Sequence, residues 1–428
     1  MNRVKTFKLF ILILAGAIAL SFYTFVVVSP VNAGEKYDLV FWHAKAGHRG
    51  KVWAKMVDEF NKIHPDIQVT ATYQGGYTVT LQKITTAIAA GATPDASEIP
   101  ERYGIPQFAE SGKLLELGRF ITKKDKADFF QGGLQRCTYK GRLYALPNSV
   151  SNSLLYYNAD MFKEVGLDPD RPPKTWEELV AYAKKLTRDM DGDGKIDKWG
   201  LGTHTTTNYF LYALILQNGG RLFDSEGNPA FTSQEAVEAC QFWSDLVHKY
   251  KVMPPLTHKA TNKLFAAGTT AMMYQSTGFL EKIGKQIGDR FDVRVAFLPK
   301  NKQYGTGLGG TVIGMFKSNP KREAATLEFV KWVTDTKWAA YWSKNTGYVA
   351  TRKSSNELAS YQKFLETHPR YKVAVEQMEY ALIMPATKAD GIIYKPFSKL
   401  AEKLEADPNV DIKKALDEIA ELVRKGAK

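Results

Sequence analysis

The stretch KYDLVFWHAKAGHRGKVWAKMVDEFNKIHPDIQVTATY, residues 36–73, indicates the fold class of the chain. Residues 36–43 are a short apolar run typical of a buried strand, and residues 67–73 are a second run rich in β-branched side chains. Between these runs, apolar residues recur at the spacing of one helix face: Val52, Trp53, Met56, Val57, Phe60 and Ile63. The segment therefore predicts a strand, a helix and a second strand.

The alternation of strands and helices continues after residue 73. We expect a helix over about 80–90, a Gly-Ala-Thr-Pro-Asp break at 91–95 and another short strand. Two later helices are predicted from capping boxes, in which a hydroxyl is followed three residues on by a carboxylate: Thr175 with Glu178, and Thr232 with Glu235. Such alternation predicts α/β layers around a mostly parallel sheet.

The carboxyl ends of the predicted strands are the expected place for a binding site. Ligands of open α/β sheets bind just beyond these ends, which directs attention to the loops after Trp42, Tyr73 and Glu98. Trp42 ends a buried strand and is expected in the core. His43, directly beyond it, is the better candidate for ligand contact.

Residues 1–33 have the features of a secretion signal. Arg3, Lys5 and Lys8 form a basic start without an acid, residues 9–28 are almost entirely apolar, and Val31-Asn32-Ala33 places small residues at the cleavage positions. About 20 apolar residues also suffice to span a bilayer, so an uncleaved anchor is the alternative. No cysteine ends the signal, which excludes lipid attachment there. We expect cleavage and a protein that acts in the periplasm.

The charge of the chain indicates a solvated surface. The 428 residues carry a net charge of +13, and removal of three signal cations leaves 13 − 3 = +10. Lys and Arg are spread among Asp and Glu and never form a dense run with aromatic residues, so we expect no nucleic-acid partner. The mature chain, 428 − 33 = 395 residues, exceeds what one hydrophobic core usually serves. Two domains are therefore expected.

The chain has two cysteines, Cys137 and Cys240. One disulfide is arithmetically possible. Cys240, however, sits in a stretch of helical apolar periodicity, and Cys137 lies about a hundred residues earlier in a strand-like segment. We expect two separate buried thiols, because free cysteine packs as a small apolar side chain.

Catalytic motifs are absent from the sequence. It has no G-x-S-x-G, no H-E-x-x-H and no P-loop, and the glycine-rich run at 305–310 lacks the spacing of a phosphate-binding loop. The seven histidines show no metal-ligand spacing. Glu98 and Glu101 could form the acid pair of a glycosidase, but nothing else in the sequence supports that alternative. We expect a binding protein that is not an enzyme and requires no cofactor.

Four short blocks stand out along the mature chain. They are VFWH at 40–43, TYQGGY at 72–77, SLLYYN at 153–158 and NTGY at 345–348. With the segment LDPDRPPKTWE at 167–177, their order over about residues 38–420 resembles the extracellular solute-binding proteins of bacterial sugar-type ABC importers. The resemblance is strongest to the glycerol-3-phosphate-binding branch. Each block alone is weak, whereas their shared order and spacing are specific.

The resemblance implies the two-lobed, type II periplasmic-binding-protein fold, an α/β architecture with three hinge crossings. The crossings would fall at 147–151, 293–297 and 333–336. Lobe one would be 34–147 plus 298–333, and lobe two 151–293 plus 337–428. In this family the lobes close about the ligand, and the closed form docks on the permease subunits of the importer. We expect a monomeric receptor of this kind.

The resemblance also implies a set of ligand-binding residues. The positions that match the glycerol-phosphate branch are Tyr77, Glu101 with Arg102 beside it, Ser151, Gly309, Gly310 and Tyr348. The segment 270–280, expected to enter the cleft from lobe two, adds Ser276, Thr277 and Gly278. Tyr209 and Tyr394 lie near positions where maltose-type relatives stack a sugar on an aromatic ring. A carboxylate such as Glu101 accepts two hydroxyl hydrogen bonds, which suits a polyol.

The chain departs from this branch at the expected phosphate contact. Thr387-Lys388 matches, but residues 389–393 lack the arginine that holds the phosphate there. Threonines also stand at 205–207, where the branch has tryptophans. Each lost charge-assisted hydrogen bond costs about 1.5–3 kcal/mol. We therefore expect a neutral sugar or polyol, with glycerol-3-phosphate or a glycerophosphodiester as the alternative and a secreted carbohydrate-active enzyme as a second alternative.

The segment 189–197 resembles a calcium-binding loop. Asp189, Asp191, Asp193 and Asp197 occupy ligand positions one, three, five and nine, with a glycine at position six. Position twelve is Gly200 instead of a bidentate glutamate. We expect any calcium binding to be weak and to have a structural role. The alternative is an acidic turn before a strand at Trp199.

Overall fold

The computed structural model describes residues 35–100, 104–203, 209–224, 226–256, 260–381 and 387–426. The expected signal, residues 1–33, lies outside this part. The described strands of the main sheet are β1 (Tyr37–His43), β2 (Ile67–Tyr73), β3 (Ala96–Pro100), β6 (Ala145–Asn158), β7 (Trp199–Thr203), β8 (Thr270–Ser276), β9 (Val293–Ala296) and β10 (Leu308–Met315). Their order is β2-β1-β3-β10-β6-β8-β7, with β9 also paired to β6.

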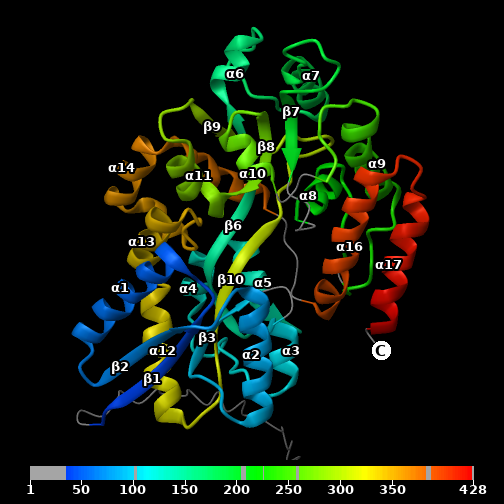
Figure 1. Cartoon of the computed structure of the whole chain (residues 1–428). Helices are drawn as coiled ribbons and strands as arrows, with labels where there is room; N and C mark the ends of the chain where they lie inside the picture. Colours follow the sequence, from blue (N-terminus) through cyan, green and yellow to red (C-terminus); the bar gives the residue numbers. More distant parts are fainter. Residues whose placement is uncertain are drawn as a thin grey trace, which may run out of the picture.

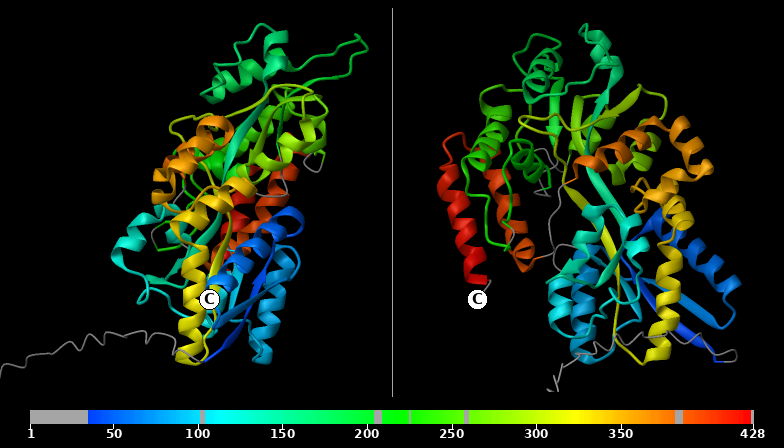
Figure 2. Two further views of the ribbon diagram at one scale, coloured as in Figure 1. Left: turned by 90° about the vertical axis from the view of Figure 1, so that its left-hand side faces the viewer. Right: turned by 180° about the vertical axis from the view of Figure 1, so that it is seen from behind.

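The molecule has two halves, one above the other in Figure 1, and the long strand β6 runs through both. The first half of β6 pairs with β10, and its second half pairs with β8 and β9. We call the half built on β1, β2 and β3 lobe one and the half built on β7, β8 and β9 lobe two. Figure 2 shows the same division from the side and from behind.

Lobe one is a sheet covered by helices on both faces. β1 pairs in parallel with β2 and β3, while β10 runs antiparallel to β3. The rings of Phe41, Trp53, Phe60 and Phe329 pack edge to face with centroids 4.8–5.4 Å apart and join the sheet to its helices. These helices are α1 (Gly47–Ile63), α2 (Tyr77–Ala90), α3 (Gly104–Glu110), α4 (Lys123–Asp128), α5 (Gln131–Arg136), α12 (Pro320–Val333) and α13 (Thr336–Thr346), with the ribbon β4 (Thr138–Tyr139) and β5 (Arg142–Leu143) beside them.

Lobe two has a parallel pair, β7 and β8, next to the antiparallel pairings of β6. Its core contains the buried rings of Trp243 and Phe397, from two helices that pack together. The described helices here are α6 (Ala159–Glu164), α7 (Trp176–Leu186), α8 (Tyr209–Gln217), α9 (Gln234–His248), α10 (Thr261–Ala266), η1 (Thr277–Phe279), α11 (Leu280–Ile287), α14 (Ala359–Thr367), α15 (Pro369–Glu376), η3 (Gln377–Tyr380), α16 (Lys388–Ala406) and α17 (Ile412–Gly426). η2 (Lys353–Glu357) connects α13 to α14.

The strand, helix and strand predicted for residues 36–73 are confirmed. The helix buries Val52, Trp53, Met56, Val57 and Phe60, as the periodicity indicates, but it begins at Gly47, before the first apolar residue. The expectation of a mostly parallel sheet is wrong: among the described strands of the main sheet, three pairings are parallel and four are antiparallel. The difference arises because β6 and β10 pass between the lobes in opposite directions.

One of the two predicted capping boxes forms at its expected residue. The Thr175 hydroxyl accepts a hydrogen bond from the backbone N–H of Glu178 at 3.1 Å. At the second, the N-cap of α9 is Ser233, so the prediction of Thr232 was wrong by one position. Cys137 and Cys240 are both buried thiols outside any disulfide, as expected.

The packing of two segments differs from the lobe boundaries inferred from sequence. Residues 298–305, expected in lobe one, stay with lobe two, because Leu298 lies in the lobe-two core and the Lys302 N–H donates to the Gln217 carbonyl at 2.9 Å. Helix α13, expected in lobe two, packs Trp338 and Trp342 into the lobe-one core. The chain therefore crosses near residues 306–310 and near Val349, where strand pairing between the lobes supplies the backbone partners.

Candidate ligand-binding cleft

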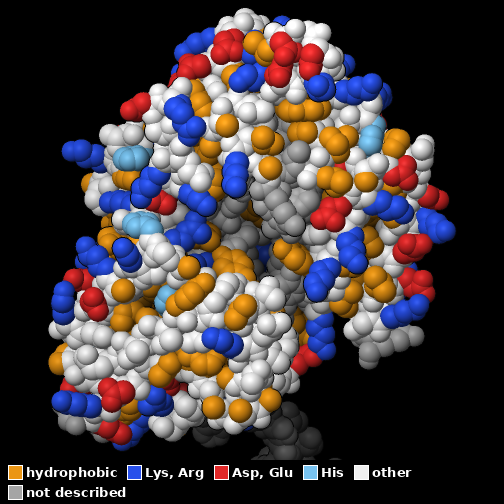
Figure 3. Space-filling model, in the orientation of Figure 1, with side chains coloured by type: hydrophobic (Ala, Val, Ile, Leu, Met, Phe, Trp, Pro, Cys, Tyr) orange, Lys and Arg blue, Asp and Glu red, His pale blue; other side chains and the backbone are white. Residues whose placement is uncertain are grey.

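A cavity of about 980 Å³ lies where the two lobes meet. From lobe one it is lined by Ala46 and Gly47 after β1, Tyr77 at the start of α2 and Pro100 at the end of β3. From lobe two it is lined by Gln275 and Ser276 at the end of β8 and by residues of α11. The carboxyl ends of the strands thus face the cavity, as expected for an α/β sheet. Lys and Arg side chains lie on the surface around this junction (Figure 3).

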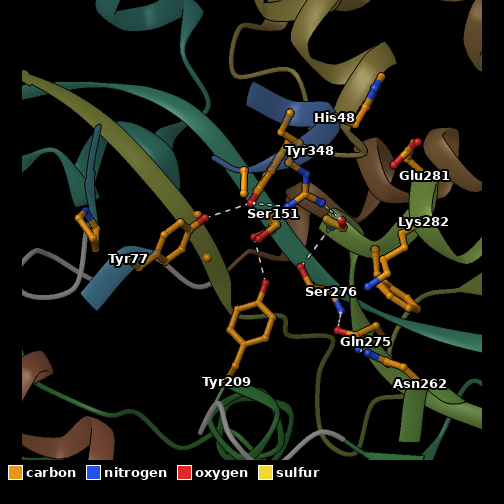
Figure 4. Close-up of a pocket in the computed structure, with 18 of the residues that line it drawn as sticks. His48, Tyr77, Ser151, Tyr209, Asn262, Gln275, Ser276, Glu281, Lys282 and Tyr348 are labelled. Atoms are coloured by element: carbon orange, nitrogen blue, oxygen red, sulfur yellow. Dashed lines mark hydrogen bonds between the residues drawn. The ribbon is translucent and has the colours of Figure 1, made fainter. Parts of the chain in front are cut away.

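Two tyrosine hydroxyls form the centre of the lobe-one wall (Figure 4). The hydroxyls of Tyr77 and Tyr348 lie 3.0 Å apart, although the residues are far apart in sequence. Beneath them the buried Lys45 ammonium donates to the Tyr77 hydroxyl at 2.7 Å and to that of Tyr348 at 3.5 Å. Since a lysine only donates, both tyrosine oxygens act as acceptors toward the protein. One hydroxyl proton of the pair is used between the rings, and the other is available to a ligand.

The two hydroxyls differ in acidity. Burial, with Tyr348 beside it, raises the pKa of Tyr77 well above its ordinary value. Burial also acts to raise the pKa of Tyr348, but the charges of Lys45 and Arg49 outweigh it, and the pKa lies below its ordinary value. Tyr348 is therefore the stronger hydrogen-bond donor of the pair.

Arg49 connects the two lobes at this wall. From α1 its guanidinium donates to the carbonyl oxygen of Gly278 in η1, and to the Tyr348 hydroxyl at 3.4 Å. The guanidinium carbon lies 4.8 Å from the centre of the Tyr348 ring, a cation–π distance. Arg49 lines the cavity, so it can meet a ligand while it holds the lobe-two loop.

A buried carboxylate, Glu98, fixes the loops behind the wall. It accepts hydrogen bonds from the backbone N–H of Ala44 at 2.8 Å and from the Thr311 hydroxyl at 3.0 Å. Its further donors are the Trp53 indole, the Asn148 amide and the Ser149 hydroxyl, and the Lys45 ammonium lies 3.8 Å away. Glu98 is fully buried and outside the cavity lining, so it acts as a structural centre of this wall.

The opposite part of the cavity is formed by Ser151, Tyr209, Gly309 and Gly310. The Tyr209 hydroxyl donates to the Ser151 carbonyl oxygen at 3.0 Å, which fixes the ring against the hinge strand β6. Gly310 has φ +118°, and a Cβ there would lie 1.5 Å from the Ser149 carbonyl oxygen. Only glycine fits this position.

Lobe two contributes uncharged polar groups next to lysines. The Gln275 amide donates to the Asn262 side chain at 2.6 Å, and the Ser276 hydroxyl accepts from the Gly278 N–H at 3.2 Å. Lys282 and Lys285 of α11 also line the cavity, and Lys285 is paired with Glu281. Amide and hydroxyl groups of this kind bind solute hydroxyls, whereas the lysines favour an acceptor or a negative charge.

Most of the residues expected from sequence come together in this cavity. They are Tyr77, Ser151, Tyr209, Ser276, Gly278, Gly309, Gly310, Tyr348 and Tyr394. Thr277 does not line it: its buried hydroxyl accepts from the Asn152 N–H at 3.2 Å and so supports the hinge strand. His43 lines a different cavity of about 600 Å³ between α1 and β2, and burial lowers its pKa. Glu101 and Arg102 lie outside the described residues.

Known proteins of similar sequence and structure agree with this architecture. The family model of bacterial extracellular solute-binding proteins matches residues 55–367. The chain belongs to this family. The sn-glycerol-3-phosphate-binding periplasmic protein of Yersinia pestis is 27% identical over 374 residues, covering 83% of this chain and 84% of that protein. Members of the family are binding proteins.

Solved structures show the same fold. UgpB of Mycobacterium tuberculosis, in complex with glycerophosphocholine, has a TM-score of 0.77 at 25% identity over 91% of this chain and 98% of that one. The cyclic α-maltosyl-1,6-maltose binding protein of Arthrobacter globiformis has a TM-score of 0.80 at 24% identity, over 91% of this chain and 98% of that one. The type II periplasmic-binding-protein fold is therefore confirmed. Among the described residues, no helix of this solute-binding protein combines the length and apolar character needed to cross a bilayer.

Sequence reasoning did not single out several of the side chains that line the cavity of this solute-binding protein, among them Arg49, Asn262, Gln275 and Lys282. Arg49 lies in the loop and first helical turn after Trp42, a region already indicated as a candidate loop. Gln275 directly precedes the predicted Ser276. Asn262 and Lys282 lie on helices, and nothing in their local sequence distinguishes them from surface residues.

The acidic loop of this solute-binding protein brings three carboxylates together. Ligand oxygens of Asp189, Asp191 and Asp197 lie within 4.8 Å of one another, while Asp193 pairs with Lys195 at 3.0 Å. The Asp189 carboxylate also accepts from the N–H groups of residues 192 and 194. Gly200 at position twelve lies in β7, where a Cβ would be 2.1 Å from the Ala183 carbonyl oxygen, so this position cannot carry a glutamate. Calcium binding stays a prediction.

Proposed function

We propose that this protein is the periplasmic receptor of an ABC importer. It captures a sugar or other polyol by closure of the two lobes and delivers it to the membrane permease. The named relatives support this proposal, since the Yersinia protein is named a periplasmic binding protein and the neighbour from Listeria monocytogenes, at 26% identity and TM-score 0.77, is an ABC substrate-binding protein in complex with cycloalternan.

The observation that carries the proposal is the lining of the cleft. Four tyrosines, Tyr77, Tyr209, Tyr348 and Tyr394, line one cavity together with hydroxyl and amide side chains. Tyrosine rings offer an apolar face for the C–H surface of a sugar and a hydroxyl for its oxygens. Such a lining, open to both lobes, suits reversible capture of a hydroxylated solute.

A second candidate ligand, a glycerol phosphate or glycerophosphodiester, is favoured by the charges in the cavity. Arg49, Lys282 and Lys285 line it, and among the described lining residues Glu281 is the one carboxylate, already paired with Lys285. The expectation of a neutral ligand rested on an arginine missing from residues 389–393. These cations come from other elements, α1 and α11, and offer an anionic group other partners.

A thermal-shift screen tests the proposal and separates the candidates. The purified mature protein is heated with sugars, polyols, glycerol-3-phosphate or glycerophosphodiesters at neutral pH. A solute that binds only the folded state at 100 times its Kd adds about 2.7 kcal/mol to the unfolding free energy and raises Tm. We expect at least one hydroxylated solute to do so and to be recovered intact. If none of these compounds raises Tm, or if the solute is turned over, the proposed function is wrong.

Tyr348→Phe is the matched variant for this screen. It removes the hydroxyl but keeps the ring, so the Tm increase caused by the solute should shrink. Because Lys45 and Arg49 also lose an acceptor, the Tm without solute should fall, and each increase is measured from the ligand-free Tm of the same variant. Tyr250→Phe is the control, since the Tyr250 ring lies near Lys184 and Lys249 and does not line the cavity. An equal Tm increase in both variants would remove Tyr348 from the site.

A further inference from the structure

An ion pair joins the two lobes outside the cavity. The Lys388 ammonium pairs with the Glu110 carboxylate. Glu110 is the last residue of α3, whose Ile105 and Phe108 lie in the lobe-one core, and Lys388 is the first residue of α16, which belongs to lobe two. α3 and α16 lie near each other in both the front and rear views (Figures 1 and 2). The pair is thus a contact that lobe opening would break.

Two lobe-one side chains, Tyr139 and Lys140, also contact the Glu110 carboxylate. The Tyr139 hydroxyl donates to Glu110 at 2.5 Å, and the Lys140 ammonium lies 3.3 Å from the same oxygen. The pKa of Glu110 is lowered to about 2, first by the hydrogen bond from Lys388 and then by that from Tyr139. Glu110 therefore carries its negative charge at any pH the cell meets. The inter-lobe partner can be removed without touching the bonds within lobe one.

The same helix carries a residue of the cleft. α16 begins at Lys388, where the Thr387 hydroxyl caps it by accepting from the Asp390 N–H at 3.2 Å, and Tyr394 lines the cavity less than two turns later. Because α16 is a continuous helix anchored in the lobe-two core by Ile393 and Phe397, its first turn and Tyr394 move together. The ion pair is thus mechanically connected to the cavity wall.

A second bridge stands on the other side of the cleft. Arg49 in α1 donates to the Gly278 carbonyl of lobe two, and in Figure 1 α1 lies on the opposite side of lobe one from α3. Bridges on both sides restrain rotation of one lobe against the other more than a single contact would. Both bridges are made by the protein itself.

We propose that Lys388 and Glu110 form a latch between the lobes, which acts with the Arg49 bridge to set how far the cleft closes. This inference rests on the proposed function, since it requires a cleft that opens and closes. The latch is half exposed, with 52% of the Lys388 side chain and 33% of that of Glu110 accessible. Exposed ion pairs of this kind change an equilibrium about two- to fivefold. A solute that binds the closed form would gain or lose affinity by the same factor.

The latch is tested on the ligand-free protein, so no solute needs to be known. Dyes on Lys113→Cys in lobe one and Leu422→Cys in lobe two report the distance between the turn after α3 and helix α17 by single-molecule energy transfer, and the native cysteines are buried. Lys388→Arg should keep the distribution of distances. Lys388→Gln should lower the ratio of closed to open molecules about two- to fivefold, and Lys388→Glu should lower it further by repulsion from Glu110.

Lys140→Gln is the matched control, because it removes a cation from the same carboxylate but within lobe one. Its distribution should equal that of the parent protein. In 0.5 M NaCl the distance distribution of the parent should approach that of Lys388→Gln, because salt screens exposed ion pairs. The distribution of Lys388→Gln itself should change little. Equal distributions for Lys388→Gln, Lys388→Glu and the parent would overturn the latch. The thermal-shift screen, in contrast, tests only the proposed function. Failure of the latch and failure of the proposed function are therefore distinguishable.

Discussion

Single buried residues hold the geometry of the cleft. Glu98 accepts hydrogen bonds from the loop after β1, from β6 and from β10, and so it connects three chain segments that form the lobe-one wall. Each oxygen faces N–H or O–H donors, so a carboxylate fits and an amide does not. Glu98 is therefore a structural centre of the lobe-one wall.

Glu98→Gln tests this role. An amide places an NH₂ group against at least one donor, which should lower the unfolding free energy by about 1–3 kcal/mol. Glu116→Gln is the control, because Glu116 lies at the surface, 3.8 Å from Arg142, and should change stability by less than about 0.5 kcal/mol. Denaturant unfolding measures both. Equal stability of the two variants would contradict the central role of Glu98.

Gly310 makes a second prediction at this scale. Its φ of +118° and the Ser149 carbonyl oxygen 1.5 Å from a hypothetical Cβ combine strain with a clash. Gly166→Ala isolates the strain, because Gly166 has φ +72° and no atom within 4 Å of its Cβ position. We expect Gly166→Ala to cost about 1 kcal/mol and Gly310→Ala to cost more, with a shift of β10 against β6. A Tm decrease no larger for Gly310→Ala would contradict this.

Arg49 links residue chemistry to ligand affinity. Arg49→Lys keeps a positive charge but loses the planar fork that reaches both Gly278 and Tyr348. One lost charge-assisted hydrogen bond, about 1.5–3 kcal/mol, corresponds to a roughly 10- to 150-fold higher Kd for the solute found in the screen. Lys55→Ala, on the same helix but outside the cavity, is the control for calorimetry and should leave Kd unchanged. An unchanged Kd for Arg49→Lys would show that the fork does not contribute to binding.

At the scale of elements, α16 is joined to α9 by an unusual carboxyl group. Glu405 on α16 accepts from the Trp243 indole of α9 at 3.1 Å and from the Leu256 N–H at 2.6 Å. Burial raises its pKa to about 7. Below pH 4.5 the group is protonated in both folded and unfolded chains, so it then has no effect on stability. Between pH 4.5 and 7 only the unfolded chain loses its proton, and stability falls by up to about 1.4 kcal/mol per pH unit.

Glu405→Gln should remove this loss. The variant's free energy of unfolding, relative to that of the parent, should increase as pH rises from 4.5 to 7, and the difference should stay constant above pH 7. Glu418→Gln on the exposed face of α17 is the control and should follow the parent at each pH. Parallel pH profiles of Glu405→Gln and the parent, measured by urea unfolding, would contradict a protonated Glu405 in the folded protein.

The acidic loop before β7 is the other element with a testable property. The carboxylates of Asp189, Asp191 and Asp197 lie close together, but position twelve is Gly200, which has no side chain to act as the bidentate calcium ligand. Millimolar calcium should raise Tm slightly in the parent and not in Asp189→Asn, which keeps one acceptor for the backbone of the loop. An unchanged Tm of the parent with calcium and with a chelator would end the calcium prediction and leave an acidic turn.

At the scale of the whole molecule, two lobes share one hinge strand and close on a cavity. β6 pairs with β10 in its first half and with β8 in its second half, and the chain crosses between the lobes again at residues 306–310 and near Val349. Closure of the lobes therefore bends a few backbone segments while the core of each lobe stays packed. Arg49 and the latch stand across the opening. Affinity is therefore set by contacts with the solute together with contacts between the lobes.

The sequence by itself determined the elements with strong local patterns. The 36–73 unit, the Thr175 cap and the burial of both cysteines follow from periodicity and side-chain chemistry over a few residues. The family resemblance also placed nine of the predicted ligand-binding residues correctly at the cavity, because related chains keep the order of these positions when the fold is shared. The 36–73 unit, the cap and the buried cysteines depend mainly on residues that are neighbours in the chain.

Only the tertiary structure decided which distant groups meet. Arg49 with Gly278, Lys388 with Glu110, and Lys45 beneath Tyr77 and Tyr348 are contacts between residues brought together by the hinge strands. The lobe membership of residues 298–305 and α13 depends likewise on packing across the sheet. Local sequence cannot specify such contacts, because nothing in the residues around a lysine distinguishes a lysine on the free surface from one that bridges the lobes. What distinguishes them is the path of the whole chain.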